Sequence, residues 1–172
     1  WHLGSAPFSL PQHHGFDVNV AGNGHGAPGN YFHPYEGDWL VPTTGLRVQW
    51  NTLLDGVSGE YLTDRLTSEA ISFIEKGDDK PFFLYFAFHV PHTPITGRDD
   101  LVATFKSKAK DDAIHNNPDY AAMVASMDES VGRIVDRLEE LGLTDNTLVV
   151  FTSDNGGLTQ RFGKHDGFTE NL

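Results

Sequence analysis

The sequence predicts an α/β fold with a mostly parallel central sheet. Two apolar runs, 82–88 and 147–153, lack the alternation of a half-exposed strand and have the composition of strands buried on both faces. Between them, the apolar residues of 118–142 recur in steps of three and four, as in an amphipathic helix. A strand, a crossover helix and a second strand form a right-handed βαβ unit, the building block of parallel sheets.

Composition and charge narrow the class of protein. A chain of 172 residues with 38% apolar and 21% charged residues suits one globular domain with a sizeable core. Its apolar runs are too short to cross a bilayer. The formal net charge of −12 leaves no basic stripe for a nucleic acid. Without cysteine, disulfides and thiolate chemistry are excluded.

Residues 1–60 differ from the rest of the chain. They are rich in Gly, Pro, His and Asn, and we expect loops there with one short strand at 46–50. From Tyr61 onward, helical periods and apolar runs follow one another, as in the core of an α/β domain.

Capping residues mark the expected helices. The first begins with Thr63 as N-cap and stops at Gly77, and a short helix is expected near 101–108. The long helix begins at Asn117 and Pro118, its apolar stripe packs into the core, and Gly142 ends it. The stripe consists of Tyr120, Val124, Met127, Val131, Ile134, Leu138 and Leu141.

Polar residues follow both predicted strands. His89 and His92 come after the first strand, and Asp154-Asn155-Gly156-Gly157 comes after the second. Ligands bind beyond the carboxyl ends of parallel strands, so these side chains are expected to share one crevice. Carboxylate and amide oxygens suit a hard cation, and imidazole carries a proton near neutral pH. The pattern favours a hydrolytic site, although an ordinary turn and solvated loop histidines remain open at this point.

Several motifs together resemble one family. Their order and rough spacing are those of the formylglycine-dependent sulfatases of the alkaline-phosphatase-like superfamily, over essentially all 172 residues. The motifs are Trp1-His2-Leu3-Gly4, Gly15-Phe16-Asp17, Pro91-His92-Thr93-Pro94 and Thr152-Ser153-Asp154-Asn155-Gly156. The resemblance implies a three-layer αβα sandwich with a mostly parallel central sheet, incomplete here at both ends. It also implies that 1–60 forms active-site and substrate-rim loops, and that 61–172 carries a helix–strand–helix–strand part of the core.

The resemblance implies roles for four residues. His2 would contact the formylglycine hydroxyls and help to break down the sulfated intermediate. His92 would bind the sulfate and protonate the departing alcohol. Asp154 and Asn155 would bind Ca²⁺, with Mg²⁺ as the less favoured cation. The implied reaction is hydrolysis of a sulfate monoester, carried by a small molecule or a saccharide, through a formylglycine nucleophile.

Departures from the family pattern leave alternatives open. The Cys/Ser-x-Pro-x-Arg segment that is converted to formylglycine is absent from this chain, as is the lysine before Trp1. We therefore expect an internal part of a longer catalytic domain, inactive alone, and by family habit periplasmic or secreted. The alternatives are a phosphonate monoester hydrolase or phosphodiesterase of the same superfamily, and a non-catalytic module that binds sulfated glycans. The particular sulfate ester and the oligomeric state stay undetermined.

Overall fold

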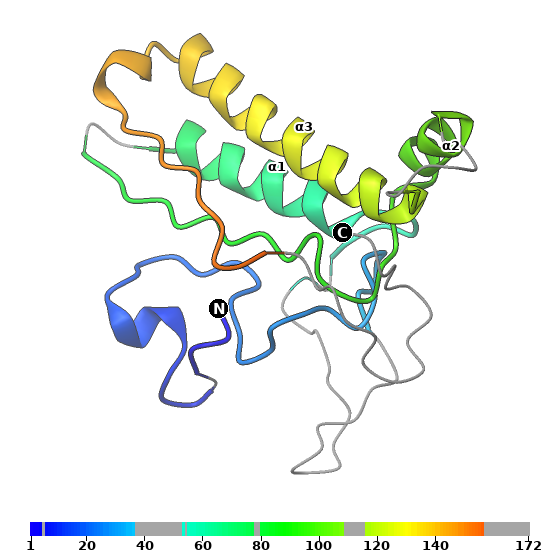
Figure 1. Cartoon of the computed structure of the whole chain (residues 1–172). Coiled ribbons are helices and arrows are strands. Elements are labelled where there is room, and N and C mark those ends of the chain that lie inside the picture. The colour runs from blue at the N-terminus through cyan, green and yellow to red at the C-terminus, as the bar shows by residue number, and fades with distance from the viewer. Residues whose placement is uncertain (5, 37–52, 54, 78–79, 109–115, 157–172) are drawn as a thin grey trace.

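The computed structural model describes residues 1–4, 6–36, 53, 55–77, 80–108 and 116–156 (Figure 1). Helices dominate this part of the chain. They are α1 (Leu62–Glu75), α2 (Asp99–Lys108) and α3 (Pro118–Glu140), with short 3₁₀ helices η1 (Pro11–His14) and η2 (Thr144–Asn146). The strand expected at 46–50 lies outside the described residues. None of the described helices combines the length and the apolar character that a membrane crossing needs.

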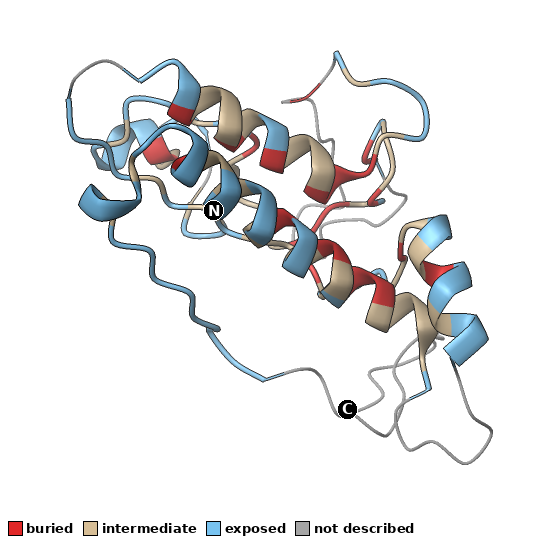
Figure 2. Ribbon diagram, turned by 90° about the horizontal axis from the view of Figure 1, so that it is seen from above, coloured by how far each residue is buried: buried red, intermediate tan, exposed pale blue. Residues whose placement is uncertain are grey.

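Helices α1 and α3 pack side by side and run in the same direction. The hydroxyls of Thr67 and Ser130 are hydrogen-bonded, and further along both helices Arg137 pairs with Glu75 at 2.8 Å. Because residue numbers rise together across these contacts, the two helices are parallel. Their outer faces are exposed to solvent (Figure 2).

The packed face of α3 differs from the predicted one. Its buried residues are Ala122, Met123, Ser126, Ser130 and Leu138. Of the predicted stripe only Leu138 is buried, while Val124 and Leu141 are exposed. Opposite this face, α1 buries Thr63, Thr67 and Ala70. Apolar periodicity missed part of the interface because Thr67 and Ser130 join the two helices through their hydroxyls.

The start of α1 also departs from the prediction. Its N-cap is Tyr61, and Thr63 lies buried in the first turn. Tyr61 is held in an extended conformation by an antiparallel bridge to Phe32, so the helix begins directly after it. The helix ends at Glu75 with Lys76 as C-cap, just before the predicted stop at Gly77. Helix α2 begins at Asp99, slightly earlier than expected.

The boundaries of α3 are as predicted. The side chain of Asn117 accepts a hydrogen bond from the Tyr120 N–H at 3.1 Å, and Pro118 is the first helical residue. At the other end Gly142 has a φ of 67°, a left-handed conformation that favours glycine. The N–H of Gly142 bonds to Glu139 and that of Leu143 to Leu138, which is the Schellman pattern.

The predicted buried strands are not formed in the described residues. In those residues the β-pairing is limited to the bridge between Phe32 and Tyr61. The two apolar runs are extended segments without strand partners there. Phe83 is 75% exposed and Leu148 is 90% exposed. Both runs return from the far end of the helices, as the topology of the βαβ prediction requires (Figure 1). In the described residues no further strand flanks these two runs, and two strands alone are marginal in water.

The first run nevertheless makes contacts on two sides, as a strand does. The ring of Phe82 packs against Phe73 of α1 at 5.9 Å between centroids. Phe83 and Tyr85 occupy the other alternating positions of the run. Their ring centroids lie 6.0 Å and 6.5 Å from that of Phe16. The segment 82–85 therefore lies between α1 and the N-terminal loops, although most of its side chains are exposed.

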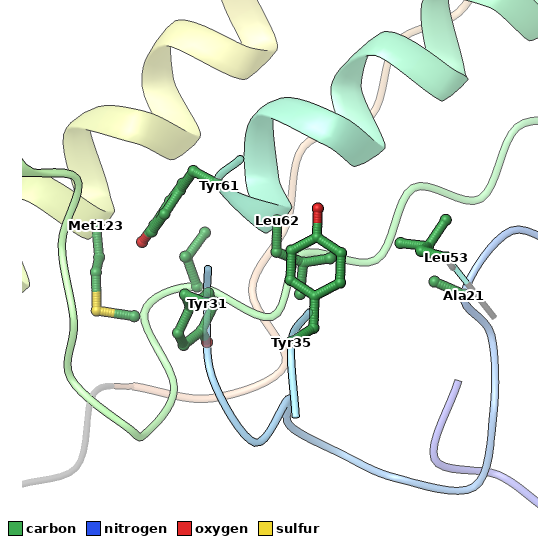
Figure 3. Packing of buried hydrophobic residues seen from close by; sticks show 8 residues of the cluster. Ala21, Tyr31, Tyr35, Leu53, Tyr61, Leu62 and Met123 are labelled. Carbon is green, nitrogen blue, oxygen red and sulfur yellow. The ribbon is translucent and has the colours of Figure 1, made fainter. Parts of the chain in front are cut away.

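One buried cluster joins the loop-rich N-terminal segment to the helices. It consists of Ala21, Tyr31, Tyr35, Leu53, Tyr61, Leu62, Val90 and Met123. Figure 3 shows Tyr31 beside Tyr61, Leu62 and Met123. The rings of Tyr31 and Tyr61 stack at 5.8 Å. The segment 21–35 is thus anchored in the core, although it contains little regular structure.

Candidate active site

His92 lies on an exposed turn directly after the first apolar run. Its backbone N–H donates to the carbonyl of His89 at 2.9 Å, which closes the turn. Its Nδ1 lies 3.0 Å from the carbonyl oxygen of Thr93. Nδ1 also lies 3.2 Å from the Thr93 hydroxyl, so Thr93 contacts this nitrogen in either tautomer of the ring. Nε2 is then the nitrogen available for exchange of a proton with a ligand.

The segment 89–98, here called the His92 loop, is fastened to the core by two tyrosines. The hydroxyl of Tyr31 donates to the carbonyls of His89 and His92 at 2.9 Å and 3.0 Å. The hydroxyl of Tyr61 donates to the carbonyl of Thr96 at 2.9 Å. Both tyrosines are buried. The exposed turn that carries His92 therefore rests on a rigid support.

The same loop passes tightly against α3 at Gly97. A Cβ atom at Gly97 would lie 2.6 Å from the Cβ of Ala122 and 2.9 Å from the backbone oxygen of Asp119. Only glycine fits this approach. The N–H of Gly97 also donates to the Asp119 carboxylate at 3.2 Å.

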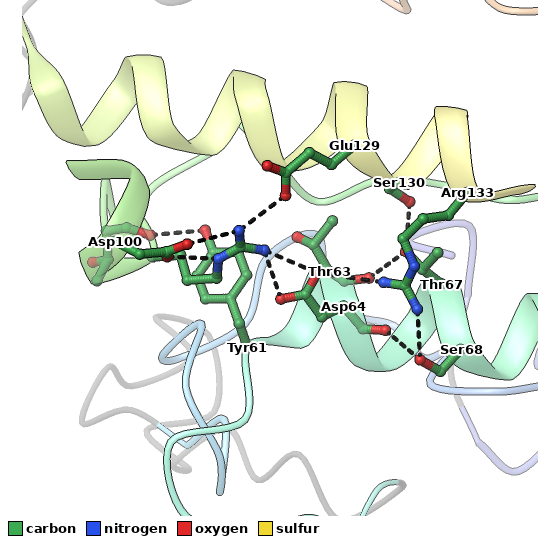
Figure 4. Close-up of polar contacts among 11 residues, drawn as sticks. Tyr61, Thr63, Asp64, Thr67, Ser68, Asp100, Glu129, Ser130 and Arg133 are labelled. Atoms are coloured by element: carbon green, nitrogen blue, oxygen red, sulfur yellow. Dashed lines mark hydrogen bonds and ion pairs between the residues drawn. The ribbon is translucent and has the colours of Figure 1, made fainter. Parts of the chain in front are cut away.

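Arg98, at the end of the His92 loop, is paired with an acidic residue of each of the three helices. Figure 4 labels these three partners. The Arg98 guanidinium lies 3.1 Å from Asp64 of α1, 2.7 Å from Asp100 of α2 and 2.9 Å from Glu129 of α3. The hydrogen bond from Arg98 lowers the pKa of the Asp100 carboxyl. These pairs fix where the loop joins α2.

His89 has a different environment from His92. The pKa of His89 is lowered to about 4, mainly because the imidazole is buried and in smaller part because of the positive charge of His92. His89 is therefore neutral at neutral pH, whereas the exposed His92 is accessible to a ligand.

His2 lies next to the loop 23–26. Its N–H donates to the carbonyl of Asn23 at 3.0 Å, and its ring packs against Gly26, where a Cβ would come within 2.4 Å of Nδ1. Burial lowers the pKa of His25, and so does the positive charge of His2. Within the described residues, no hydrogen bond joins His2 to His92.

Asp154 and Asn155 form an exposed turn at the end of the second run. Asp154 Oδ1 accepts from the Asn155 N–H, and Asn155 Nδ2 donates to the Gly156 carbonyl, both at 2.8 Å. Their donor atoms suit a hard cation in kind, but six to eight oxygens are needed. Within the described part of the chain, no three His, Asp or Glu side chains form a metal site. Gly157 of this motif lies outside the described residues.

The sequence patterns missed the residues that support the His92 loop. Tyr31 lies in a segment without apolar periodicity. Arg98 lies elsewhere, in a run of positively and negatively charged residues. A signal was present for Tyr31, because a large aromatic residue inside a Gly/Pro-rich loop is suited to bury its ring and use its hydroxyl.

Comparison with known proteins places the chain among sulfatases. A family model described as Sulfatase matches residues 8–171. A sulfatase of Formosa agariphila is 37% identical over 141 residues, which cover 74% of this chain and 25% of that protein. The N-acetylgalactosamine-6-sulfatase of Mus musculus is 33% identical over 168 residues, covering 91% of this chain and 29% of that protein.

Solved structures give the same result. The crystal structure of Ps i-CgsB in complex with k-i-k-neocarrahexaose matches with a TM-score of 0.63 and 31% identity, over 85% of this chain and 34% of that one. The described helices therefore belong to a sulfatase fold. The chain spans about a quarter to a third of the length of the relatives and structures that it matches. On the family match over residues 8–171, this chain belongs to the sulfatase family.

Proposed function

We propose that this chain carries part of the active site of an enzyme that hydrolyses sulfate monoesters. The observation that carries the proposal is the exposed His92 imidazole, presented by a loop whose backbone is hydrogen-bonded to the core. Within a chain of the sulfatase family, such a group is suited to bind a sulfate and to protonate an alcohol.

His92 supplies the acid in this proposal. The contact of Nδ1 with the Thr93 carbonyl orients the ring and leaves Nε2 to face the substrate. In its cationic form the ring attracts the sulfate, and Nε2 donates its proton to the leaving oxygen as the S–O bond breaks. The ring is then neutral and regains a proton from solvent.

Asp154 and Asn155 would hold a divalent cation, Ca²⁺ in preference to Mg²⁺. They supply two oxygen ligands, and further ligands would come from groups outside the described residues. When bound, the cation offsets negative charge that builds on the sulfuryl oxygens. His2 would accept a proton from a hydroxyl at the reacting centre. The formylglycine nucleophile implied by the family is not supplied by these 172 residues.

The substrate class that we propose is a sulfated saccharide. The support comes from the names of similar proteins, an N-acetylgalactosamine-6-sulfatase and a structure bound to k-i-k-neocarrahexaose. The chain has a net charge of −12, which does not favour a sulfated substrate by itself. The sulfate group would therefore be recognised by the divalent cation and by local groups such as His92.

Substitution of His92 in the complete enzyme tests the proposal. His92→Ala should lower kcat for a sulfated monosaccharide about 10²-fold or more, because the leaving oxygen then departs unprotonated. His13→Ala is the matched control, since it removes another exposed histidine. Equal kcat values for the parent and His92→Ala would contradict the assignment. A matched phosphate ester should react more slowly than the sulfate, and the reverse order would favour a phosphoester hydrolase.

A further inference from the structure

Tyr31 combines complete burial with a hydroxyl that reaches the turn carrying His92. Its side chain is 0% exposed and its ring stacks on Tyr61. Its backbone carbonyl accepts a hydrogen bond from the Leu62 N–H at 2.8 Å, so the residue is joined to the start of α1. The ring position is therefore set by the core and not by solvent.

The hydroxyl of Tyr31 contacts both ends of one tight turn. It lies 2.9 Å from the His89 carbonyl and 3.0 Å from the His92 carbonyl, while the His92 N–H itself bonds to His89. One hydroxyl proton shared by two carbonyls is a three-centre hydrogen bond. Burial raises the pKa of Tyr31, so the group remains a donor across the physiological range. The geometry of the turn then follows the position of this one oxygen.

Two other buried tyrosines show what is particular to Tyr31. The hydroxyl of Tyr61 also reaches the His92 loop, but at the carbonyl of Thr96, four residues beyond His92. The hydroxyl of Tyr35 donates instead to the Glu60 carboxylate at 2.8 Å. All three are buried to a similar degree. Of the three tyrosine hydroxyls, that of Tyr31 is the one that bonds to the backbone of His92 itself.

We infer that Tyr31 is the positioning residue for His92, holding the imidazole in the orientation in which it donates its proton. The inference rests on the proposed function, because it assumes that His92 acts on the substrate. It predicts that loss of one buried hydroxyl, away from the substrate, lowers the rate of the chemical step without weakening substrate binding. Displacement of a catalytic group by about 1 Å can cost about 10²-fold in rate.

The first experiment measures the turn itself. In the complete enzyme, amide hydrogen exchange at His92 should be about 10-fold faster in Tyr31→Phe than in the parent, because the turn loses its donor. Tyr35→Phe is the matched control, since it removes an equally buried hydroxyl that does not touch the loop. Equal exchange at His92 in the two variants would overturn the inference.

The second experiment measures catalysis with the same variants. Tyr31→Phe should lower kcat about 10-fold to 100-fold at unchanged KM, and Tyr35→Phe should retain both constants. Unchanged kcat in Tyr31→Phe, in an enzyme that His92→Ala inactivates, would overturn the inference and leave the proposed function standing. Full activity in His92→Ala would contradict the proposed function, and faster exchange at the turn would then be structural only.

Discussion

The two segments that follow the apolar runs are supported in different ways. The His92 loop is hydrogen-bonded to Tyr31 and Tyr61, which are 35 to 61 residues away in the sequence. The turn at Asp154 and Asn155 has hydrogen bonds only to residues at most two positions away, within the described part of the chain. The first segment rests on the buried cluster, and the second is exposed throughout.

The difference shows which half of the proposed site this chain organises. The position of His92 follows from contacts inside the described residues, and it can be altered by core substitutions. Within the described residues, Asp154 and Asn155 have hydrogen bonds only to neighbouring positions, and the proposed cation would need further ligands. Substitutions should therefore affect the two segments differently.

The largest expected effect on stability comes from the core beneath the His92 loop. Met123 is 0% exposed and belongs to the cluster of Tyr31 and Tyr61. Met123→Ala should lower the free energy of unfolding by about 2–5 kcal/mol, because it leaves a cavity there. Urea denaturation measures this value. Val135→Ala, at a 39% exposed position of α3, is the control and should cost much less. Equal losses in the two variants would contradict the assigned core.

The pH dependence of stability should be set partly by His89. Its pKa is about 4 in the fold and 6.5 when unperturbed. His89 therefore binds a proton more tightly in the unfolded chain than in the fold. The stability associated with neutral His89 is complete above pH 6.5. It is lost as the pH falls toward 4, by up to about 3 kcal/mol. Unfolding measured from pH 7 to pH 4 should show a smaller decline in His89→Gln. The same decline in both proteins would be inconsistent with a buried neutral His89.

Loss of the second tyrosine hydroxyl should have a smaller effect. Tyr61→Phe removes the hydrogen bond to the Thr96 carbonyl and should cost about 1–3 kcal/mol, since that carbonyl loses its donor. Thermal unfolding measures the cost. Tyr85→Phe, at a residue that is 56% exposed, is the matched control and should be close to neutral. A neutral Tyr61→Phe would mean that the loop is not held at Thr96.

The smallest effect is expected at the exposed turn. Without calcium, Asp154→Ala should change the free energy of unfolding by no more than about 0.5 kcal/mol, because in the described part of the chain the Asp154 carboxylate is hydrogen-bonded only to the next residue. In the complete enzyme, added calcium should raise the melting temperature of the parent and not of the variant. An equal rise in melting temperature for the parent and for Asp154→Ala would show that Asp154 is not a ligand of the cation.

Local signals in the sequence predicted local structure well. Asn117 and Gly142 cap α3 as expected, because a cap depends on neighbouring backbone groups. The face of α3 that packs was predicted wrongly, since Thr67 and Ser130 meet through hydroxyls that apolar patterns do not register. The parallel sheet was predicted from burial, yet Leu148 is exposed, because strands require neighbours that sequence patterns alone do not provide.

The roles of the site residues remain predictions. His92 was identified from its place after an apolar run and from family motifs, and the structure places it on an exposed turn. Tyr31 and Arg98 were not identified, because their roles depend on contacts across 58 residues for Tyr31 and across 34 residues for Arg98, which apolar periodicity does not reveal. The metal-binding role of Asp154 and Asn155 remains a prediction.

A crystal structure of the complete enzyme with calcium and a sulfated saccharide tests the central claim most directly. Nε2 of His92 should lie within hydrogen-bond distance of the ester oxygen, while oxygens of Asp154 and Asn155 coordinate a cation that contacts the same sulfate. A His92 ring that faces away from the sulfate, or a cation bound without Asp154 and Asn155, would contradict it.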